Sequence, residues 1–145
     1  MNLVWGDARR VTLAYARHEG TLEIEPLGRG VHVLCNDRLG ADGFPRGERL
    51  RAALGAIAGQ SFAASRATIE RALGDHTRLP LAEVPPSHLP VELARELTAT
   101  CIHSEYYGTR SATVFAAAPG RALHYLHADG PPCTVPFTDR MTLLG

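Results

Sequence analysis

The chain has no lysine and no excess of charge. All fifteen of its basic side chains are arginine, and fifteen acidic residues balance them. A protein that binds nucleic acid by neutralising phosphates needs surplus positive charge, so this balance argues against nucleic acid as a partner. No apolar run approaches the roughly 18 residues that a membrane-spanning helix requires, so we predict no membrane span. Arginine in place of lysine, with abundant alanine, glycine and proline, is typical of a GC-rich bacterial genome.

Cysteine is scarce and unpatterned. Cys35, Cys101 and Cys133 are odd in number and widely spaced, and the chain has no Cys-x-x-Cys pair. A disulfide framework needs paired cysteines in an oxidising compartment. The cysteine usage therefore favours a reducing, cytoplasmic location.

The length and composition indicate one domain. A chain of 145 residues, 45% of them hydrophobic, is long enough to bury a core, and we predict a single domain over residues 1–145. Met1 is followed at once by Asn2-Leu3-Val4-Trp5, a pattern typical of the interior of a buried strand. We therefore expect the chain to begin in the middle of a larger domain.

Strands are predicted at both ends of the chain. Short segments rich in Val, Leu, Ile, Thr and Tyr, separated by turn residues, predict strands at 2–5, 11–17, 22–27 and 31–36. Near the C-terminus, a turn at Pro119-Gly120 predicts a hairpin of residues 111–118 and 121–128, with a closing strand near 133–137.

Helices are predicted between these two groups of strands. Apolar residues at helical spacing predict a helix from Pro45 to about Gly59 and another over 90–99. A further helix is predicted up to Leu73, with Ser65 as its N-cap. The proline-rich segment 79–90 is either an ordered crossing or a mobile lid. The order predicts an α+β fold in which helices cover one face of antiparallel sheets.

Histidine and cysteine residues raise the question of zinc. His124 and His127 lie three residues apart, with His103, Cys101 and Cys133 elsewhere in the chain. On the predicted strand 121–128, positions three apart point to opposite faces, so this pair cannot chelate one ion. Scattered surface histidines are the simpler interpretation. We therefore predict no metal site and no cofactor.

No pattern identifies a nucleophile. The chain has no Gly-x-Ser-x-Gly elbow, and Gly28-Arg29-Gly30 lacks the rest of a phosphate-binding fingerprint. Cys35 ends an apolar segment and has no evident activating group beside it. We interpret Cys35 as a buried structural cysteine.

Two polar stretches remain as candidate sites. Asn36 follows the apolar residues 31–34 and carries a neutral donor amide, although a simple turn asparagine is the competing interpretation. The second stretch, residues 106–114, reads Tyr-Tyr-Gly-Thr-Arg-Ser-Ala-Thr-Val and directly precedes the strongest predicted strand. Its Arg110 is suited to clamping a carboxylate or phosphate, and equally to bridging two loops. Spacing alone leaves both questions open.

Four motifs in order carry a family resemblance. They are Asn2-Leu3-Val4-Trp5-Gly6-Asp7, Gly30-Val31-His32-Val33-Leu34-Cys35-Asn36, Arg46-Gly47-Glu48-Arg49-Leu50 and Tyr107-Gly108-Thr109-Arg110-Ser111-Ala112-Thr113-Val114. Together they span nearly the whole chain, and they resemble the NRDE family, the family of the transport and Golgi organisation 2 protein. Cys35 stands where that family has a small serine, and Ala112 replaces the second serine of its Arg-Ser-Ser-Thr motif.

The resemblance implies a fold and a site. The fold is an αββα sandwich similar to that of N-terminal nucleophile hydrolases, with a cysteine nucleophile directly after the initiator methionine and an Asn-Arg-Asp-Glu segment. This sequence contains neither, so we expect it to match the C-terminal part of such a protein. By analogy, Asn36 would stabilise an oxyanion and Arg110 would lie near the nucleophile. Tyr107, Thr109 and Ser111 are the candidate substrate-binding residues.

Two functions are compatible with the resemblance. The first is a cysteine-type amidohydrolase of a small-molecule substrate, which we expect to be inactive as this chain alone. The second is a carrier or chaperone that binds haem or an acyl lipid without catalysis. Exposed strand edges would also favour self-association into a homo-oligomer.

Overall fold

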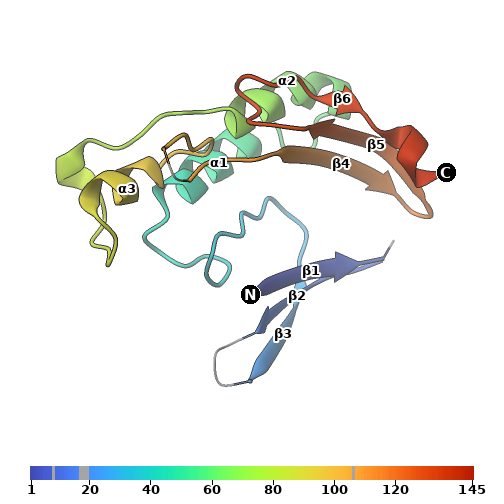
Figure 1. Cartoon of the computed structure of the whole chain (residues 1–145). Coiled ribbons are helices and arrows are strands. Elements are labelled where there is room, and N and C mark those ends of the chain that lie inside the picture. The colour runs from blue at the N-terminus through green and yellow to red at the C-terminus, as the bar shows by residue number, and fades with distance from the viewer. Residues whose placement is uncertain (8, 17–19, 106) are drawn as a thin grey trace.

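The computed structural model describes residues 1–7, 9–16, 20–105 and 107–145. Within these residues, two three-stranded antiparallel sheets are separated in sequence by three α-helices. Figure 1 shows the two sheets as distinct layers, and the long irregular segment 28–44 leads from the first sheet to α1 (Pro45–Gly55). The α+β class predicted from the sequence is therefore confirmed.

The first sheet is a meander of β1 (Asn2–Gly6), β2 (Val11–Ala16) and β3 (Leu22–Leu27), close to the predicted strands. Asp7 closes the turn between β1 and β2. Its carboxylate accepts the backbone N–H groups of Arg9 and Arg10 at 2.7 and 3.0 Å. These two hydrogen bonds hold the pKa of Asp7 below its usual range. In the first motif, Gly6 therefore ends β1 by pairing with Val11, and Asp7 begins the turn.

The helices are α1 (Pro45–Gly55), α2 (Phe62–Leu73) and α3 (Val91–Glu96). Pro45 opens α1 as predicted, where its missing N–H costs nothing. α2 begins earlier than predicted, because the hydroxyl of Ser61 caps it by accepting the N–H of Ala64 at 3.3 Å. Ser65 is buried inside the helix, so the prediction that it is the N-cap is wrong. The added turn brings Phe62 onto the core of the second sheet.

The second sheet consists of β4 (Ala112–Ala118), β5 (Arg121–Ala128) and the short β6 (Thr138–Asp139). β4 and β5 form the predicted hairpin, and Gly120 supplies the positive φ of +76° that its turn requires. One face of this sheet packs on α2, which lies on the side away from the first sheet (Figure 1). Its core consists of Val114, Leu126, Ala128 and Phe137, packed against Phe62, Ile69 and Leu73.

The strand predicted over residues 31–36 is absent. This segment is irregular, and it pairs with no strand in the described part of the chain. The side-chain amide of Asn2 instead donates to the carbonyl oxygens of Cys35 and Asp37. The apolar run has strand propensity, but a strand also needs a neighbouring strand with which its backbone can form hydrogen bonds.

The closing strand predicted near 133–137 exists as β6, but it is shorter than predicted and begins later. Residues 131–135 form a turn in which the N–H groups of Thr134 and Val135 donate to the carbonyl oxygen of Pro131. Pairing with β5 begins only at Thr138. The proline-rich segment 79–90 contains a short 3-10 helix, Leu81–Glu83, and leads into α3.

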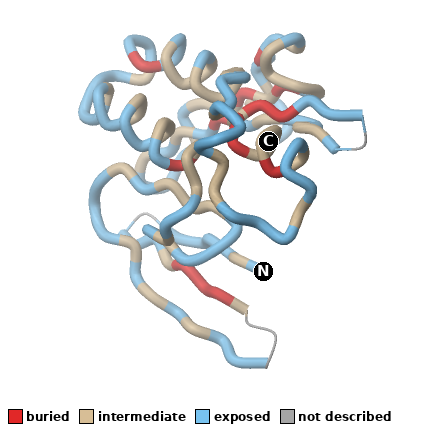
Figure 2. The backbone as a smooth tube through the Cα atoms, turned by 90° about the vertical axis from the view of Figure 1, so that its left-hand side faces the viewer, coloured by how far each residue is buried: buried red, intermediate tan, exposed pale blue. Residues whose placement is uncertain are grey.

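Buried residues gather in two regions, shown in red in Figure 2. One is the middle of β2, where Leu13, Ala14 and Tyr15 are almost fully enclosed. The other surrounds the second sheet and extends along residues 98–102. None of the helices formed by the described residues has the length and apolarity needed to cross a membrane.

Leu126→Ala should destabilise the protein by about 2–5 kcal/mol, because this side chain is 3% exposed and fills the core beneath α2. Leu123→Ala is the matched control on the same strand. Leu123 is 40% exposed, and its loss should cost less than about 1 kcal/mol. Urea unfolding followed by circular dichroism measures both. Equal losses would contradict the packing of this face on α2.

Candidate functional site

A cavity of about 540 Å³ lies between the start of α1, residues 84–89 and α3. This volume is typical of small-molecule sites, which range over about 300–1,000 Å³. Two of the predicted site residues, Asn36 and Tyr107, line it. Its wall is mostly apolar and includes Val84, Pro85, Leu89, Leu93 and Leu97. Besides Asn36 and Tyr107, its polar lining comprises Arg46, Ser87, His88 and Thr98.

The segment that carries Asn36 is held by the first sheet. The amide of Asn2 in β1 bridges the carbonyl oxygens of Cys35 and Asp37, at 3.1 and 2.9 Å, on either side of Asn36. Asn2 belongs to the first motif, and the sequence alone did not predict that it forms this bridge.

A buried phenol adds a second anchor to the same segment. The hydroxyl of Tyr15 in β2 accepts the N–H of Leu39 at 3.2 Å and donates to Glu25. Burial, followed by the hydrogen bond to Glu25, raises the pKa of Tyr15, so the phenol keeps its proton at neutral pH. Residues 35–39 are therefore tied to β1 and β2 by side chains.

Cys35 faces α1 and does not line the pocket with Asn36. A Cβ atom on Gly47 would lie 2.9 Å from Cys35 Sγ, so any larger residue at this position of the helix would force the Cys35 side chain to move. Cys35 and Gly47 together line a separate hollow of about 30 Å³. The cysteine and the glycine of the second and third motifs thus form one packing contact, and the interpretation of Cys35 as a structural residue agrees with it.

The Tyr-Gly-Thr-Arg-Ser motif divides into two parts. Tyr107 lines the pocket, whereas Arg110 and Ser111 are exposed and are not among the residues that line it. Thr109 Oγ1 accepts the N–H of Ile102 at 2.9 Å, and the Thr109 N–H donates to the Ile102 carbonyl at 2.9 Å. Thr109 therefore fixes the neighbouring segment. The roles predicted for these residues in catalysis and substrate binding stay predictions, and Tyr106 lies outside the described residues.

Arg49 of α1 fixes the other side of that segment. One of its terminal nitrogens, Nη2, donates to the carbonyl oxygens of Thr77, at 2.7 Å, and of Thr98. The N–H of Cys101 in turn donates to the carbonyl oxygen of Asp75 at 2.9 Å. Burial alone would raise the pKa of Asp75, but hydrogen bonds from Thr77 and the charge of Arg49 outweigh it and lower that pKa.

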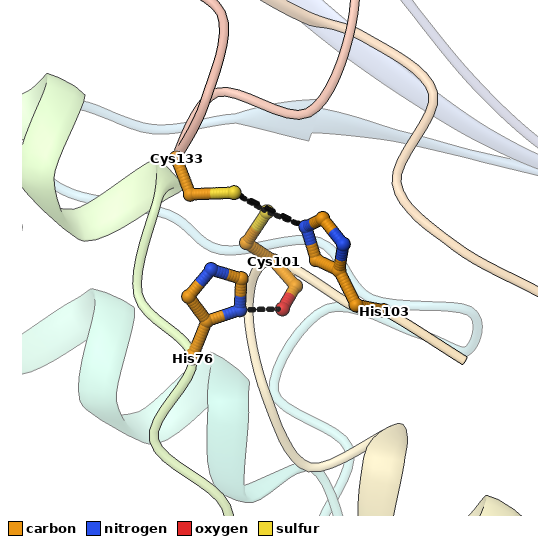
Figure 3. Close-up of side chains that lie close together, drawn as sticks. All are labelled: His76, Cys101, His103 and Cys133. Carbon is orange, nitrogen blue, oxygen red and sulfur yellow. Dashed lines mark hydrogen bonds between the residues drawn. The ribbon is translucent and has the colours of Figure 1, made fainter.

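These anchors bring four sulfur and nitrogen ligands together (Figure 3). Ligand atoms of His76, Cys101, His103 and Cys133 all lie within 4.8 Å of one another. The two Sγ atoms are 3.6 Å apart, and His103 Nε2 lies 3.1 Å from Cys133 Sγ and 3.7 Å from Cys101 Sγ. Burial, and then the hydrogen bond to Cys133, raises the pKa of the fully buried Cys101. Two thiols and two imidazoles form a donor set that suits a transition-metal ion.

Sequence reasoning missed this cluster because it weighed a different histidine pair. His124 stacks on the ring of Phe62, with centroids 4.0 Å apart, and His127 Nδ1 hydrogen-bonds Thr113 Oγ1 at 2.9 Å. Those two histidines point to different partners, as the strand geometry predicted. The overlooked signal was Cys101-x-His103, because residues two apart on an extended segment share a face.

The fold and the order of the motifs define an α+β protein in which side chains of the motifs, among them Asn2 and Thr109, anchor the segments beside the pocket. The chain belongs to the Transport and Golgi organisation 2 family, whose sequence model matches residues 1–127. The resemblance drawn from the four motifs is therefore confirmed. No curated protein and no solved structure matches the chain. The αββα sandwich that the resemblance implies stays a prediction.

Asn2→Asp should destabilise the protein by about 1–3 kcal/mol, because a carboxylate cannot donate to the two carbonyl oxygens that the amide now bridges. Urea unfolding measures this loss. Asn36→Asp is the matched control: this residue is exposed, and the same change there should stay within about 0.5 kcal/mol. If the control were the more damaging variant, Asn2 would not be the anchor of this segment.

Proposed function

We propose that this protein binds an amphipathic small molecule, an acyl compound or haem, in the pocket beside α1 and α3. The observation that carries the proposal is the composition of the pocket wall. Five of its apolar residues, Val84, Pro85, Leu89, Leu93 and Leu97, surround about 540 Å³ that is open to a ligand. A wall of this kind favours the apolar body of a ligand by removing it from water.

The polar residues of the pocket support an anionic group on that ligand. Arg46 is only partly exposed, and no carboxylate among the described residues forms an ion pair with it. A guanidinium presents a planar fork of donors that matches a carboxylate or a phosphate. Acyl phosphates, acyl-CoA and haem each combine an apolar body with such a group. The amide of Asn36 and the phenol of Tyr107 add neutral donors.

An amidohydrolase is the alternative, and one observation favours it. Asn36 lines the pocket, where its amide would be available to stabilise an oxyanion. Against this, none of the described residues that line the pocket is a cysteine, and Cys35 packs against Gly47. Binding without turnover therefore accounts for the pocket with fewer assumptions.

Arg46→Gln should weaken binding of haem or lauroyl-CoA about tenfold or more, because a hydrogen bond to a charged group contributes about 1.5–3 kcal/mol. Fluorescence and absorbance titrations measure the dissociation constants. Arg51→Gln is the matched control, since Arg51 is exposed on the same helix and is not among the residues that line the pocket. We expect its affinity to equal that of the unchanged protein.

Release of free CoA thiol in the same titration separates the two functions. Binding that depends on Arg46, with no release of thiol, supports the carrier. Steady release of thiol that Asn36→Ala abolishes, while binding persists, would instead establish a hydrolase that cleaves the thioester in this pocket. An unchanged protein that binds neither haem nor lauroyl-CoA would contradict the proposal for this pocket.

A further inference from the structure

We propose that His76, Cys101, His103 and Cys133 form a structural Zn²⁺ site. The proposal is independent of the pocket and of its ligand. These residues come from three separate segments: the loop after α2, the segment before β4 and the loop after β5. Figure 3 shows their side chains directed toward a common centre.

The distances between ligand atoms match a tetrahedral ion. With Zn–S of about 2.3 Å and Zn–N of about 2.0–2.1 Å, the edges of the tetrahedron measure roughly 3.3–3.8 Å. The edges between Cys101, Cys133 and His103 are 3.6, 3.1 and 3.7 Å. Three ligands therefore already stand close to the positions that one ion would require. The fourth, His76, falls within the same 4.8 Å group.

His76 makes a hydrogen bond through one ring nitrogen, as zinc-bound histidines usually do. Its Nδ1–H donates to the carbonyl oxygen of Cys101 at 3.0 Å. A hydrogen bond from one ring nitrogen fixes the tautomer and leaves the other nitrogen as an unprotonated ligand. For His76 this ligand is Nε2. The same carbonyl belongs to a residue of the site, so the bond also ties two ligands to each other.

The backbone around Cys101 and His103 is fixed before any ion binds. The N–H of Cys101 donates to Asp75, and that of Ile102 donates to Thr109, both at 2.9 Å. Ile102, which lies between the two ligands, is 5% exposed and points away from them into the protein. Preformed ligands reduce the entropy that binding would otherwise cost.

The donor set favours zinc in a closed structural site. Two thiolates would neutralise the charge of a divalent cation, and soft sulfur ligands favour zinc over magnesium or calcium. Four protein ligands fill a tetrahedral shell and leave no position for a substrate. Entry is open, because His76 and Cys133 line an open hollow of about 590 Å³ at the surface.

A disulfide between Cys101 and Cys133 is the competing use of the two thiols. Their Sγ atoms are 3.6 Å apart, well beyond the bond length of about 2.05 Å. A disulfide would also leave His76 and His103 with no ion to bind. Their rings nevertheless converge on the two thiols and contact each other, with centroids 4.8 Å apart. The convergence of both imidazoles is what the metal explains and the disulfide does not.

Co²⁺ is the probe that tests the site. The full chain, reduced, stripped with chelator and desalted, should take up one equivalent of Co²⁺. We expect the intense visible bands of tetrahedral cobalt and a thiolate-to-cobalt charge-transfer band. Zn²⁺ should displace the cobalt and raise the Tm of the stripped protein.

The variants make the test specific. Cys133→Ser should remove about half of the charge-transfer intensity and weaken Zn²⁺ binding at least about 100-fold, because loss of a mere second-shell partner already costs about 10–100-fold. His76→Gln should weaken binding while keeping the charge-transfer band. Both residues lie at or near the surface, so neither change should prevent folding.

Cys35→Ser is the matched control, since this third cysteine packs on Gly47 outside the cluster, and its spectrum should equal that of the unchanged protein. A reduced chain that stays colourless in excess Co²⁺ would overturn the proposal and leave the disulfide as the use of these thiols. Bands that survive unchanged in Cys133→Ser would overturn it as well.

Discussion

The guanidinium of Arg49 is the contact on which the arrangement of the loops depends. It extends from α1 and donates to the carbonyl oxygens of Thr77 and Thr98. Both carbonyls belong to segments outside the helices and strands. Its Nε is buried with no hydrogen-bond acceptor among the described residues and lies 3.8 Å from the Asp75 carboxylate. A buried carbonyl that loses its donor costs about 1–3 kcal/mol. Arg49 therefore satisfies the part-buried carbonyl oxygen of Thr98 and ties it to the exposed carbonyl of Thr77, which holds together the segments that carry His76 and Cys101.

Asn2 anchors the backbone beside the pocket in the same way as Arg49 anchors the backbone beside the cluster. Both side chains donate to two backbone carbonyl oxygens that lie far away in sequence. Irregular backbone that is partly buried must find hydrogen-bond partners outside regular ladders, and long polar side chains supply them. Arg46 lies on α1, whereas Asn36, Tyr107 and the four residues of the cluster lie on such irregular segments. Their positions are consequently set by a few side-chain anchors and much less by the two sheets.

The parts of the fold that depend on local sequence could be predicted. The hairpin of β4 and β5 follows from an apolar run and a Pro119-Gly120 turn, and Pro45 marks the start of α1. Prediction failed where the conformation of a segment depends on a contact with a residue far away in the sequence. Residues 31–36 resemble a strand, but their neighbour is the side chain of Asn2 and no strand. The ligands of the cluster extend from His76 to Cys133, and no spacing rule joins them.

The residues of the family's motifs mostly hold the backbone around the pocket and the cluster in place, and few of them line the pocket. Asn2, Gly47 and Thr109 are anchors or packing positions, and Gly108 must be small because a Cβ there would lie 3.0 Å from the Ile102 carbonyl. Of the polar residues that line the pocket, Arg46 belongs to the third motif, whereas Ser87, His88 and Thr98 belong to none of the four. A chain can therefore keep all four motifs while part of the pocket lining changes. The residues that line the pocket, more than the motifs, would for this reason decide which small molecule fits it.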